Sequence, residues 1–227
     1  MAVVPRLLRR NVAFLCCDLQ SAFQTAVPEF DRAAFVAIRM LRFAALNITA
    51  RPIRYIITEQ YPKGLGHTVD SILTEAARLG SQPTTATEGR VVTAPPHAFQ
   101  AEVFAKTQFS MATPELLESL HRTSVDAVVI FGIEAHVCVQ QTVLDLVQAN
   151  TKVWIAADGT HSQVAEDRDY ALKRFGSMYP DVVVSTSEAI LFDLVGDAKH
   201  PGFKVFSQLM KERYVRKTTP DRSGTAE

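Results

Sequence analysis

The stretch Val128–Leu146 constrains the fold more than any other part of the chain, because a strand pattern runs directly into a helix pattern. Its first residues, Val128–Phe131, are β-branched or aromatic, and such a short apolar run is typical of a buried strand. A mixed polar turn, Gly132–Val137, follows. From Cys138 onward apolar residues recur at roughly helical spacing, so we expect a helix to begin near Cys138. These apolar positions are Val139, Val143, Leu144 and Leu146.

Cys138 is therefore predicted to lie where a strand turns into a helix. The first backbone N–H groups of a helix have no intrahelical partner and point at whatever occupies the crevice in front of them. The same position favours the thiolate, which is the nucleophilic form of cysteine. Position alone leaves a second interpretation open, in which Cys138 is a small buried apolar residue, as most free cysteines are.

Strand patterns and helix patterns alternate along the whole chain of 227 residues. This alternation predicts a single doubly wound, three-layer α/β/α domain with a mostly parallel sheet. We expect the domain to span residues 1–215 and the charged segment 216–227 to be a disordered tail. Besides Val128–Phe131, the predicted strands are Asn11–Leu19, Ile53–Thr58, Val91–Val92, Ala101–Thr107, Lys152–Ala157 and Asp181–Thr186. Besides the helix near Cys138, the predicted helices are Phe30–Ala45, Ile72–Leu79, Pro114–His121, Val164–Phe175, Ser187–Leu194 and Gly202–Tyr214.

Composition excludes several classes of protein. The formal net charge is zero, which argues against a strong nucleic-acid-binding surface, although a local basic patch is compatible with it. No apolar run approaches the ~20 residues that a membrane-spanning helix needs. The chain has only three cysteines, two of them adjacent, which is not the pattern of a disulfide-rich secreted protein. We therefore expect a cytoplasmic protein, with a mitochondrial location as the alternative because arginines gather near the N-terminus.

Two charged residues lie at the carboxyl ends of other predicted strands. Asp18 ends the first apolar run, and Lys106 lies at the exit of the strand that precedes the Cys138 region. Since such strand ends share one crevice in an open α/β sheet, we expect Asp18, Lys106 and Cys138 to converge there. A thiol nucleophile needs a proton acceptor and donors for the developing oxyanion, and this set supplies both. Simpler interpretations remain, with Asp18 capping a loop through Ser21 and Lys106 solvated.

Loops at the same edge of the sheet are expected to form a substrate pocket. The segment Glu59–His67 is rich in turn residues and polar groups, which is typical of a functional loop. The predicted pocket residues are Gln20, Phe23, Gln60, Tyr61 and Phe109.

Several of these segments resemble the isochorismatase-like hydrolase family, which includes the nicotinamidases. The resemblance covers roughly residues 12–209, and the order and spacing of the motifs make it specific. The motifs shared with the family are Cys17-Asp-Leu-Gln20, Phe104-Ala-Lys-Thr-Gln-Phe-Ser110 and Phe131-Gly-Ile-Glu-Ala-His-Val-Cys-Val139. The segments Thr58–Gly66 and Ser185–Glu188 look like the eukaryotic isochorismatase domain-containing proteins.

The resemblance implies a parallel sheet of about six strands, which is a Rossmann-like arrangement, and an Asp18–Lys106–Cys138 catalytic triad. It also implies a cis peptide bond between Ile133 and Glu134, which would aim the N–H of Glu134 into an oxyanion hole beside that of Cys138. No cofactor is expected. Because members of the family commonly form dimers or larger rings, a homo-oligomer is expected.

Cys138 distinguishes the two chemistries of the resembling family. Members that cleave the vinyl ether of isochorismate typically lack this cysteine, whereas members that carry it hydrolyse amide-type C–N bonds of small molecules through a thioester. The resemblance therefore implies the second chemistry here. Two functions of other classes stay open: a non-catalytic binding or scaffold protein with a relic triad, and a nucleic-acid-binding or ribonuclease-type protein.

The chain departs from the nicotinamidases at their metal site. Those enzymes carry Asp-x-His after the second strand, whereas this chain has Gln60, Tyr61 and Pro62 there. No two of the six histidines are spaced as neighbours on one helix or strand, and a tight site needs three or four converging ligands. His67 and Glu59 could act as ligands, but two ligands are too few to hold a metal ion firmly. The sequence therefore predicts no metal site, and nicotinamide becomes a doubtful substrate.

The first prediction concerns this metal site. Protein purified without added metal is expected to contain no stoichiometric transition metal in elemental analysis, because too few ligands converge. Treatment with EDTA should leave the thiol reactivity unchanged. A stoichiometric metal whose removal abolishes that reactivity would contradict the prediction and restore nicotinamide as a serious substrate.

Overall fold

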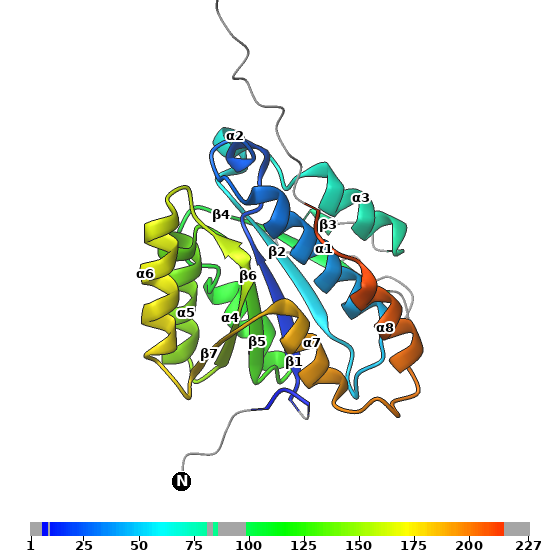
Figure 1. Cartoon of the computed structure of the whole chain (residues 1–227). Coiled ribbons are helices and arrows are strands. Elements are labelled where there is room, and N and C mark those ends of the chain that lie inside the picture. The colour runs from blue at the N-terminus through cyan, green and yellow to red at the C-terminus, as the bar shows by residue number, and fades with distance from the viewer. Residues whose placement is uncertain (1–5, 9, 81–83, 86–98, 216–227) are drawn as a thin grey trace, which may run out of the picture.

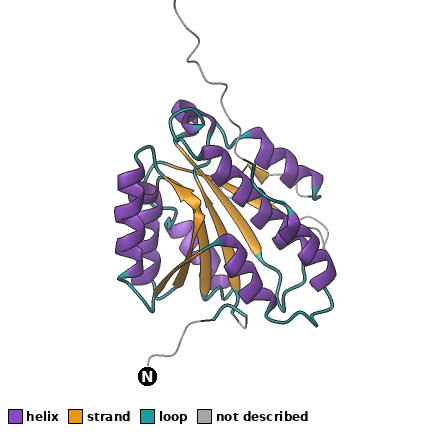
Figure 2. Cartoon of the chain, viewed as in Figure 1, coloured by secondary structure: helices purple, strands orange, loops and turns teal. Residues whose placement is uncertain are grey.

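The computed structural model describes residues 6–8, 10–80, 84–85 and 99–215 (Figure 1). Within them the chain forms a parallel sheet between two layers of helices (Figure 2), so the predicted α/β/α architecture is confirmed. The predicted strand Val91–Val92 and the predicted tail 216–227 lie outside the described residues.

The sheet has seven strands in the order β3-β4-β2-β1-β5-β6-β7, and every neighbouring pair is parallel. Six were expected from the resemblance; the additional strand, β3, has only two residues and falls in a segment without a strand pattern. The strands are β1 (Val12–Cys17), β2 (Arg54–Gln60), β3 (Thr84–Thr85), β4 (Ala101–Lys106), β5 (Ala127–Ile133), β6 (Lys152–His161) and β7 (Val182–Ser185).

The strand order reverses at β1. From β1 the sheet grows through β2 and β4 on one side and through β5, β6 and β7 on the other. At such a reversal the connections leave in opposite directions, and a crevice opens outside the carboxyl ends of the two central strands. Asp18 follows β1 directly and Cys138 follows β5, so both residues lie at this edge of the sheet, where such a crevice is expected.

Each face of the sheet packs against its own set of helices, and each interface has its own apolar core. Residues of α1, α3, α7 and α8 pack on one face together with Phe14 and Cys16 of β1. Residues of α4, α5 and α6 pack on the other face with Leu15 and Cys17. Because both faces are covered, β1 is buried at every position, which explains its continuous apolar sequence. The helices are α1 (Phe30–Leu46), α2 (Pro62–Leu65), α3 (Asp70–Arg78), α4 (Pro114–Arg122), α5 (Gln140–Gln148), α6 (Ala165–Gly176), α7 (Ser187–Val195) and α8 (Phe203–Lys211).

The helix after β5 begins earlier than its apolar pattern predicted. A wide helical turn, η2 (Ala135–Val139), precedes α5, and the N–H of Val139 donates to the Glu134 carbonyl five residues before it. This π-type spacing does not follow the 3.6-residue period, so a search for that period finds only the later residues. The helical turn thus begins three residues before Cys138, which lies inside η2, and α5 itself begins two residues after Cys138.

No helix among the described residues combines the length and the apolar character needed to cross a membrane.

Gly132 allows β5 to pass close to β1 beside the crevice. Its φ is 123°, and a β-carbon built there would lie 2.1 Å from the carbonyl oxygen of Cys17. Only glycine adopts this conformation without strain, and the clash is with backbone, which cannot move aside.

We therefore expect Gly132→Ala to lower the free energy of unfolding by about 3 kcal/mol or more, because backbone strain and a steric clash add. Gly176→Ala is the matched control, since a β-carbon at Gly176 meets no atom within 4 Å. It should change stability by less than about 1 kcal/mol. Urea unfolding of both variants checks the prediction, and equal stabilities would contradict it.

Candidate active site

Asp18 turns the chain out of β1 and buries its carboxylate. Its φ of 50° lies in the left-handed region, which aspartate tolerates better than most residues. The side chain is 1% exposed. Its Oδ1 accepts a hydrogen bond from Thr58 Oγ at 2.7 Å, and its Oδ2 accepts one from Lys106 Nζ at 2.7 Å. The carboxylate is thus paired with Lys106 and Thr58, and these bonds account for its burial better than a loop cap through Ser21 does.

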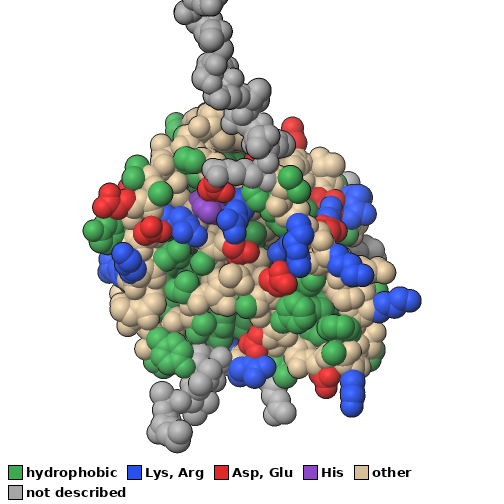
Figure 3. Space-filling view, viewed as in Figure 1, with side chains coloured by type: hydrophobic (Ala, Val, Ile, Leu, Met, Phe, Trp, Pro, Cys, Tyr) green, Lys and Arg blue, Asp and Glu red, His purple; other side chains and the backbone are tan. Residues whose placement is uncertain are grey.

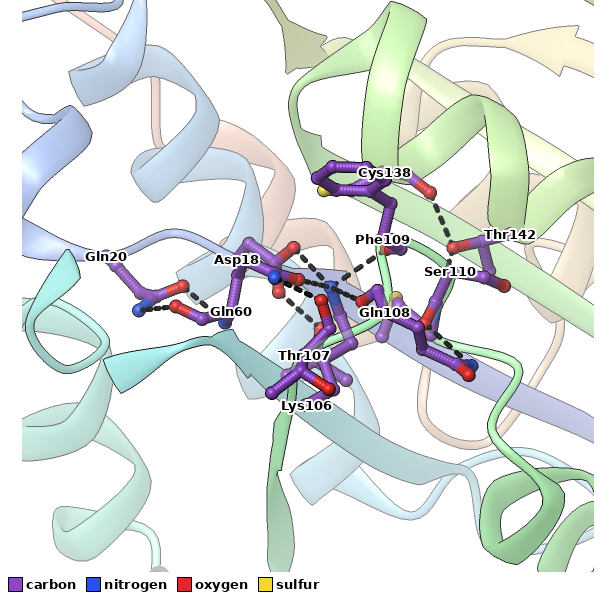
Figure 4. Close-up of polar contacts among 12 residues, drawn as sticks. Asp18, Gln20, Gln60, Lys106, Thr107, Gln108, Phe109, Ser110, Cys138 and Thr142 are labelled. Carbon is purple, nitrogen blue, oxygen red and sulfur yellow. Dashed lines mark hydrogen bonds and ion pairs between the residues drawn. The ribbon is translucent and has the colours of Figure 1, made fainter. Parts of the chain in front are cut away.

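Lys106 ends β4 and points across the neighbouring β2 toward Asp18 (Figure 4). Its side chain is 1% exposed, so the interpretation of a solvated lysine is wrong. Besides the Asp18 bond, Nζ donates to Gln60 Oε1 at 2.9 Å and to the Phe109 carbonyl at 2.9 Å. All three N–H bonds of the ammonium therefore have acceptors, which is the condition for burying a charge.

Charge also holds Lys106 in its protonated form. Burial lowers the pKa of Lys106, but nearby negative charge at Cys17, Asp18 and Cys138 outweighs burial, and the pKa lies above its ordinary value. At neutral pH the Cys17 thiol is protonated, because burial and the adjacent Cys138 thiol raise its pKa well above the usual range. The Asp18 carboxylate, which accepts a hydrogen bond from Nζ, is therefore a partner that maintains the Lys106 ammonium at neutral pH.

Cys138 lies in η2 at the start of the helix that follows β5, and it is 8% exposed. Its carbonyl accepts a hydrogen bond from the Thr142 hydroxyl at 2.6 Å. The same Thr142 Oγ accepts a hydrogen bond from the N–H of Met111 at 2.8 Å. Thr142 thus fixes the turn of the cysteine to the loop that supplies the Phe109 carbonyl. In Figure 4 the Phe109 side chain extends in the direction of Cys138.

The peptide bond between Ile133 and Glu134 is cis, as the resemblance implied. Hydrogen bonds to Glu134 hold the segment in place. The Glu134 side chain accepts from the N–H of Gln163 at 3.0 Å, and its carbonyl accepts from the N–H of Val137 at 3.1 Å. Two residues later, His136 Nδ1 lies 3.1 Å from Ser162 Oγ. The segment after β6 therefore supports the turn that carries Cys138.

The predicted pocket residues differ in burial and in the groups that they contact. Gln20 is fully buried, and its amide bonds the backbone of Gln60 and the carbonyl of Gly66, so it ties two loops together. Phe23 is partly buried and packs against the core on the α1 side of the sheet. Gln60 contacts Lys106 directly. Tyr61 and Phe109 are each more than half exposed, at 55% and 51%.

Sequence reasoning missed the residues that complete the site. Thr58 and Thr142 each donate a hydrogen bond to a triad residue, and both are buried. Thr58 pairs in register with Cys17, so its position beside Asp18 depends on the β1–β2 alignment. A polar residue at the end of an apolar strand was the only available signal. For Thr142, its place one helical turn after the cysteine was the signal.

Glu59 and His67, the two ligand-type residues noted in the sequence, do contact each other. Glu59 Oε2 lies 2.9 Å from His67 Nδ1, while its Oε1 accepts from the N–H of Thr68 at 2.7 Å. Across the described ranges, no group of three or more His, Cys, Asp or Glu residues is arranged to hold a metal ion.

The three thiols should differ sharply in reactivity. We expect iodoacetamide at neutral pH to alkylate Cys138 and to spare Cys16 and Cys17 in the folded protein. Cys16 and Cys17 are fully buried, and burial raises the pKa of Cys16 to about 12 and that of Cys17 well above its usual range. Peptide mapping by mass spectrometry checks this, with urea-unfolded protein as the control in which all three react. Preferential labelling of Cys16 or Cys17 would contradict the assignment of Cys138 as the nucleophile.

Comparison with known proteins places this arrangement in a family. The family model described as the isochorismatase domain matches residues 12–188. The chain is 37% identical over 212 residues to isochorismatase domain-containing protein 1 of Salmo salar, covering 93% of this chain but only 65% of that protein. The chain thus spans slightly less than two thirds of that relative.

Solved structures agree with this result. A putative Mar1 ribonuclease from Leishmania major is 38% identical, with a TM-score of 0.74 and coverage of 90% of this chain and 93% of that chain. The YcaC gene product of Escherichia coli, described as an octameric hydrolase of unknown specificity, shares the fold at 16% identity. Its TM-score is 0.71, over 92% of this chain and 91% of that chain. By its family match and by its similarity to these relatives, the chain belongs to the isochorismatase-domain family.

Proposed function

We propose that this protein is a cysteine hydrolase that cleaves a small amide-type C–N bond through a thioester on Cys138. The observation that carries the proposal is the buried Asp18–Lys106 ion pair, which lies with Cys138 at the carboxyl-end edge of the sheet. Membership in a family of hydrolases supports the reaction type. A buried ion pair is an expensive way to stabilise a fold, and a thiol beside it gives the pair a chemical use.

In the first step, the Cys138 sulfur attacks the carbonyl carbon of the substrate while the thiol proton passes to the Asp18 carboxylate. The carbonyl π electrons move onto oxygen, and the backbone N–H groups of Glu134 and Cys138 stabilise that oxyanion. Collapse of the intermediate breaks the C–N bond, and Asp18 returns the proton to the leaving amine. A thioester of Cys138 remains.

In the second step, Asp18 takes a proton from water, and the resulting hydroxide attacks the thioester carbon. The C–S bond breaks, the acid leaves, and the proton on Asp18 restores the thiol. Lys106 holds Asp18 in position during both steps, and it balances the carboxylate charge when Asp18 is ionised. The bonds from Lys106 to Gln60 and Phe109 fix the ammonium in this role.

Ribonuclease activity is the second candidate function. It rests on the name of the Leishmania major relative, a putative Mar1 ribonuclease, at 38% identity. Cleavage of a phosphodiester needs stabilisation of charge on several phosphate oxygens, yet the Lys106 ammonium already has acceptors for all its N–H bonds. The site therefore favours a carbonyl centre. The protein is also proposed to form a homo-oligomer, as reported for the octameric YcaC that shares its fold.

The proposal predicts an acyl-enzyme. Incubation with a panel of small amides, followed by mass spectrometry of the intact protein, should detect an acyl adduct on Cys138 for at least one amide. For that amide, Cys138→Ala should abolish turnover. Asp18→Asn should lower turnover by at least ~100-fold, because proton transfer is lost, while binding stays within a few fold.

Asp181→Asn is the matched control, since Asp181 also pairs with a lysine, Lys152, but at the surface. This variant should turn over the amide like the wild type. An RNA oligonucleotide belongs in the same panel. Degradation of that RNA, dependent on Cys138 and without any amide adduct, would overturn the amide hydrolase in favour of a ribonuclease.

A further inference from the structure

A second pocket lies on the face of the sheet opposite Cys138. It has a volume of about 420 Å³, within the range of small-molecule sites. Four of its lining residues come from α1, and the others come from the end of β6, the start of α7 and the segment after α8. Figure 3 shows the face that carries α1 and α8, where arginine and lysine side chains lie among acidic ones. The pocket shares no lining residue with the triad.

Arg39 is the unusual residue of this pocket. It is only 6% exposed, yet within the described part of the chain no carboxylate comes within 4.0 Å of its guanidinium. One nitrogen donates to the Glu212 carbonyl at 2.7 Å, and another reaches Ser187 Oγ at a long 3.5 Å. Its Nε is buried without an acceptor. A guanidinium is always charged, and such a group is rarely buried without a counterion.

The two carboxylates of the pocket are occupied elsewhere. Asp158 accepts from both the N–H and the hydroxyl of Ser187, at 2.6 and 2.7 Å, and so caps the first turn of α7. Glu188 lies 3.4 Å from Arg213. With Arg32 also lining the pocket, three guanidinium groups face two carboxylates, and the site retains a net positive charge.

Aromatic rings form an apolar wall beside these charges. The Phe35 and Tyr214 rings lie with centroids 5.8 Å apart, and the Arg39 guanidinium stands 4.7 Å over the Phe35 ring. A flat apolar group can therefore lie against the rings while an attached anion reaches the arginines.

We propose that this pocket binds a small organic oxyanion, a carboxylate or a phosphate ester on a flat apolar body, with its charge between Arg32, Arg39 and Arg213. The oxyanion supplies the counterion that Arg39 lacks and accepts hydrogen bonds from guanidinium groups, which match carboxylate and phosphate geometry. Asp158 and Glu188 restrict the site to ligands with a single anionic group, because a second anion would face like charge. This binding site is independent of the chemistry at Cys138.

Isothermal titration calorimetry with phenyl phosphate and with benzoate tests the proposal, and phenol serves as the neutral probe. At constant ionic strength, at least one of the two anions should bind saturably at millimolar concentration, and phenol should bind at least about tenfold more weakly. Arg32→Gln and Arg213→Gln, both at exposed positions, should together weaken binding of the anion by at least about tenfold. Arg51→Gln is the matched control, because Arg51 is exposed and does not line the pocket, and it should bind like the wild type.

Alkylation of Cys138 separates this site from the active site, and it should leave the affinity for the anion unchanged. Loss of binding on alkylation would assign the anion to the triad crevice and overturn the proposal. Absence of saturable binding of either anion to the wild type, or equal affinity in the Arg32→Gln, Arg213→Gln double variant, would overturn it as well.

Discussion

The buried ion pair between Asp18 and Lys106 is the interaction on which the rest of the site depends. Without its partner, either residue would be an uncompensated charge in the interior. Removing one partner of a buried ion pair typically destabilises the fold by about 3–5 kcal/mol. The pair is tolerable only because Thr58, Gln60 and the Phe109 carbonyl satisfy its remaining hydrogen bonds. Three strands must therefore align before either charge is stable, since Asp18 follows β1, Thr58 and Gln60 lie on β2, and Lys106 ends β4.

The reversal of strand order at β1 determines where this pair meets the thiol. β5 lies beside β1 on the side opposite β2, so the residues after β5 reach the crevice from the other direction. Gly132 permits the close approach of the two strands, and the wide η2 turn then places Cys138 within the first helical residues. Thr142 and Met111 tie this turn back to the loop after Lys106. The two halves of the site thus support each other through the Thr142 hydroxyl, which bonds the backbone of both.

Much of the fold was predictable from sequence because its signals are local. Strand-like runs rich in apolar residues identified six strands, and the predicted helix Pro114–His121 begins at the same residue as α4, which Thr113 caps. The convergence of strand ends also follows from parallel topology alone. Register and non-helical spacing were not accessible in this way. The pairing of Thr58 with Cys17 depends on long-range strand alignment, and the π-type turn at Cys138 departs from the regular helical period, so local patterns encode neither.

The proposed direction of proton transfer agrees with the same electrostatics. The charge of Asp18 helps to hold the pKa of Lys106 above its ordinary value, so the amine stays protonated throughout the neutral range and cannot accept the thiol proton. Cys16 and Cys17 are held protonated by burial and offer no basic site. In the proposed mechanism, Asp18 is therefore the group that carries the proton in both directions. The mechanism gives Lys106 the part of a fixed charge that orients the carboxylate, which agrees with its burial and with the acceptors on all its N–H bonds.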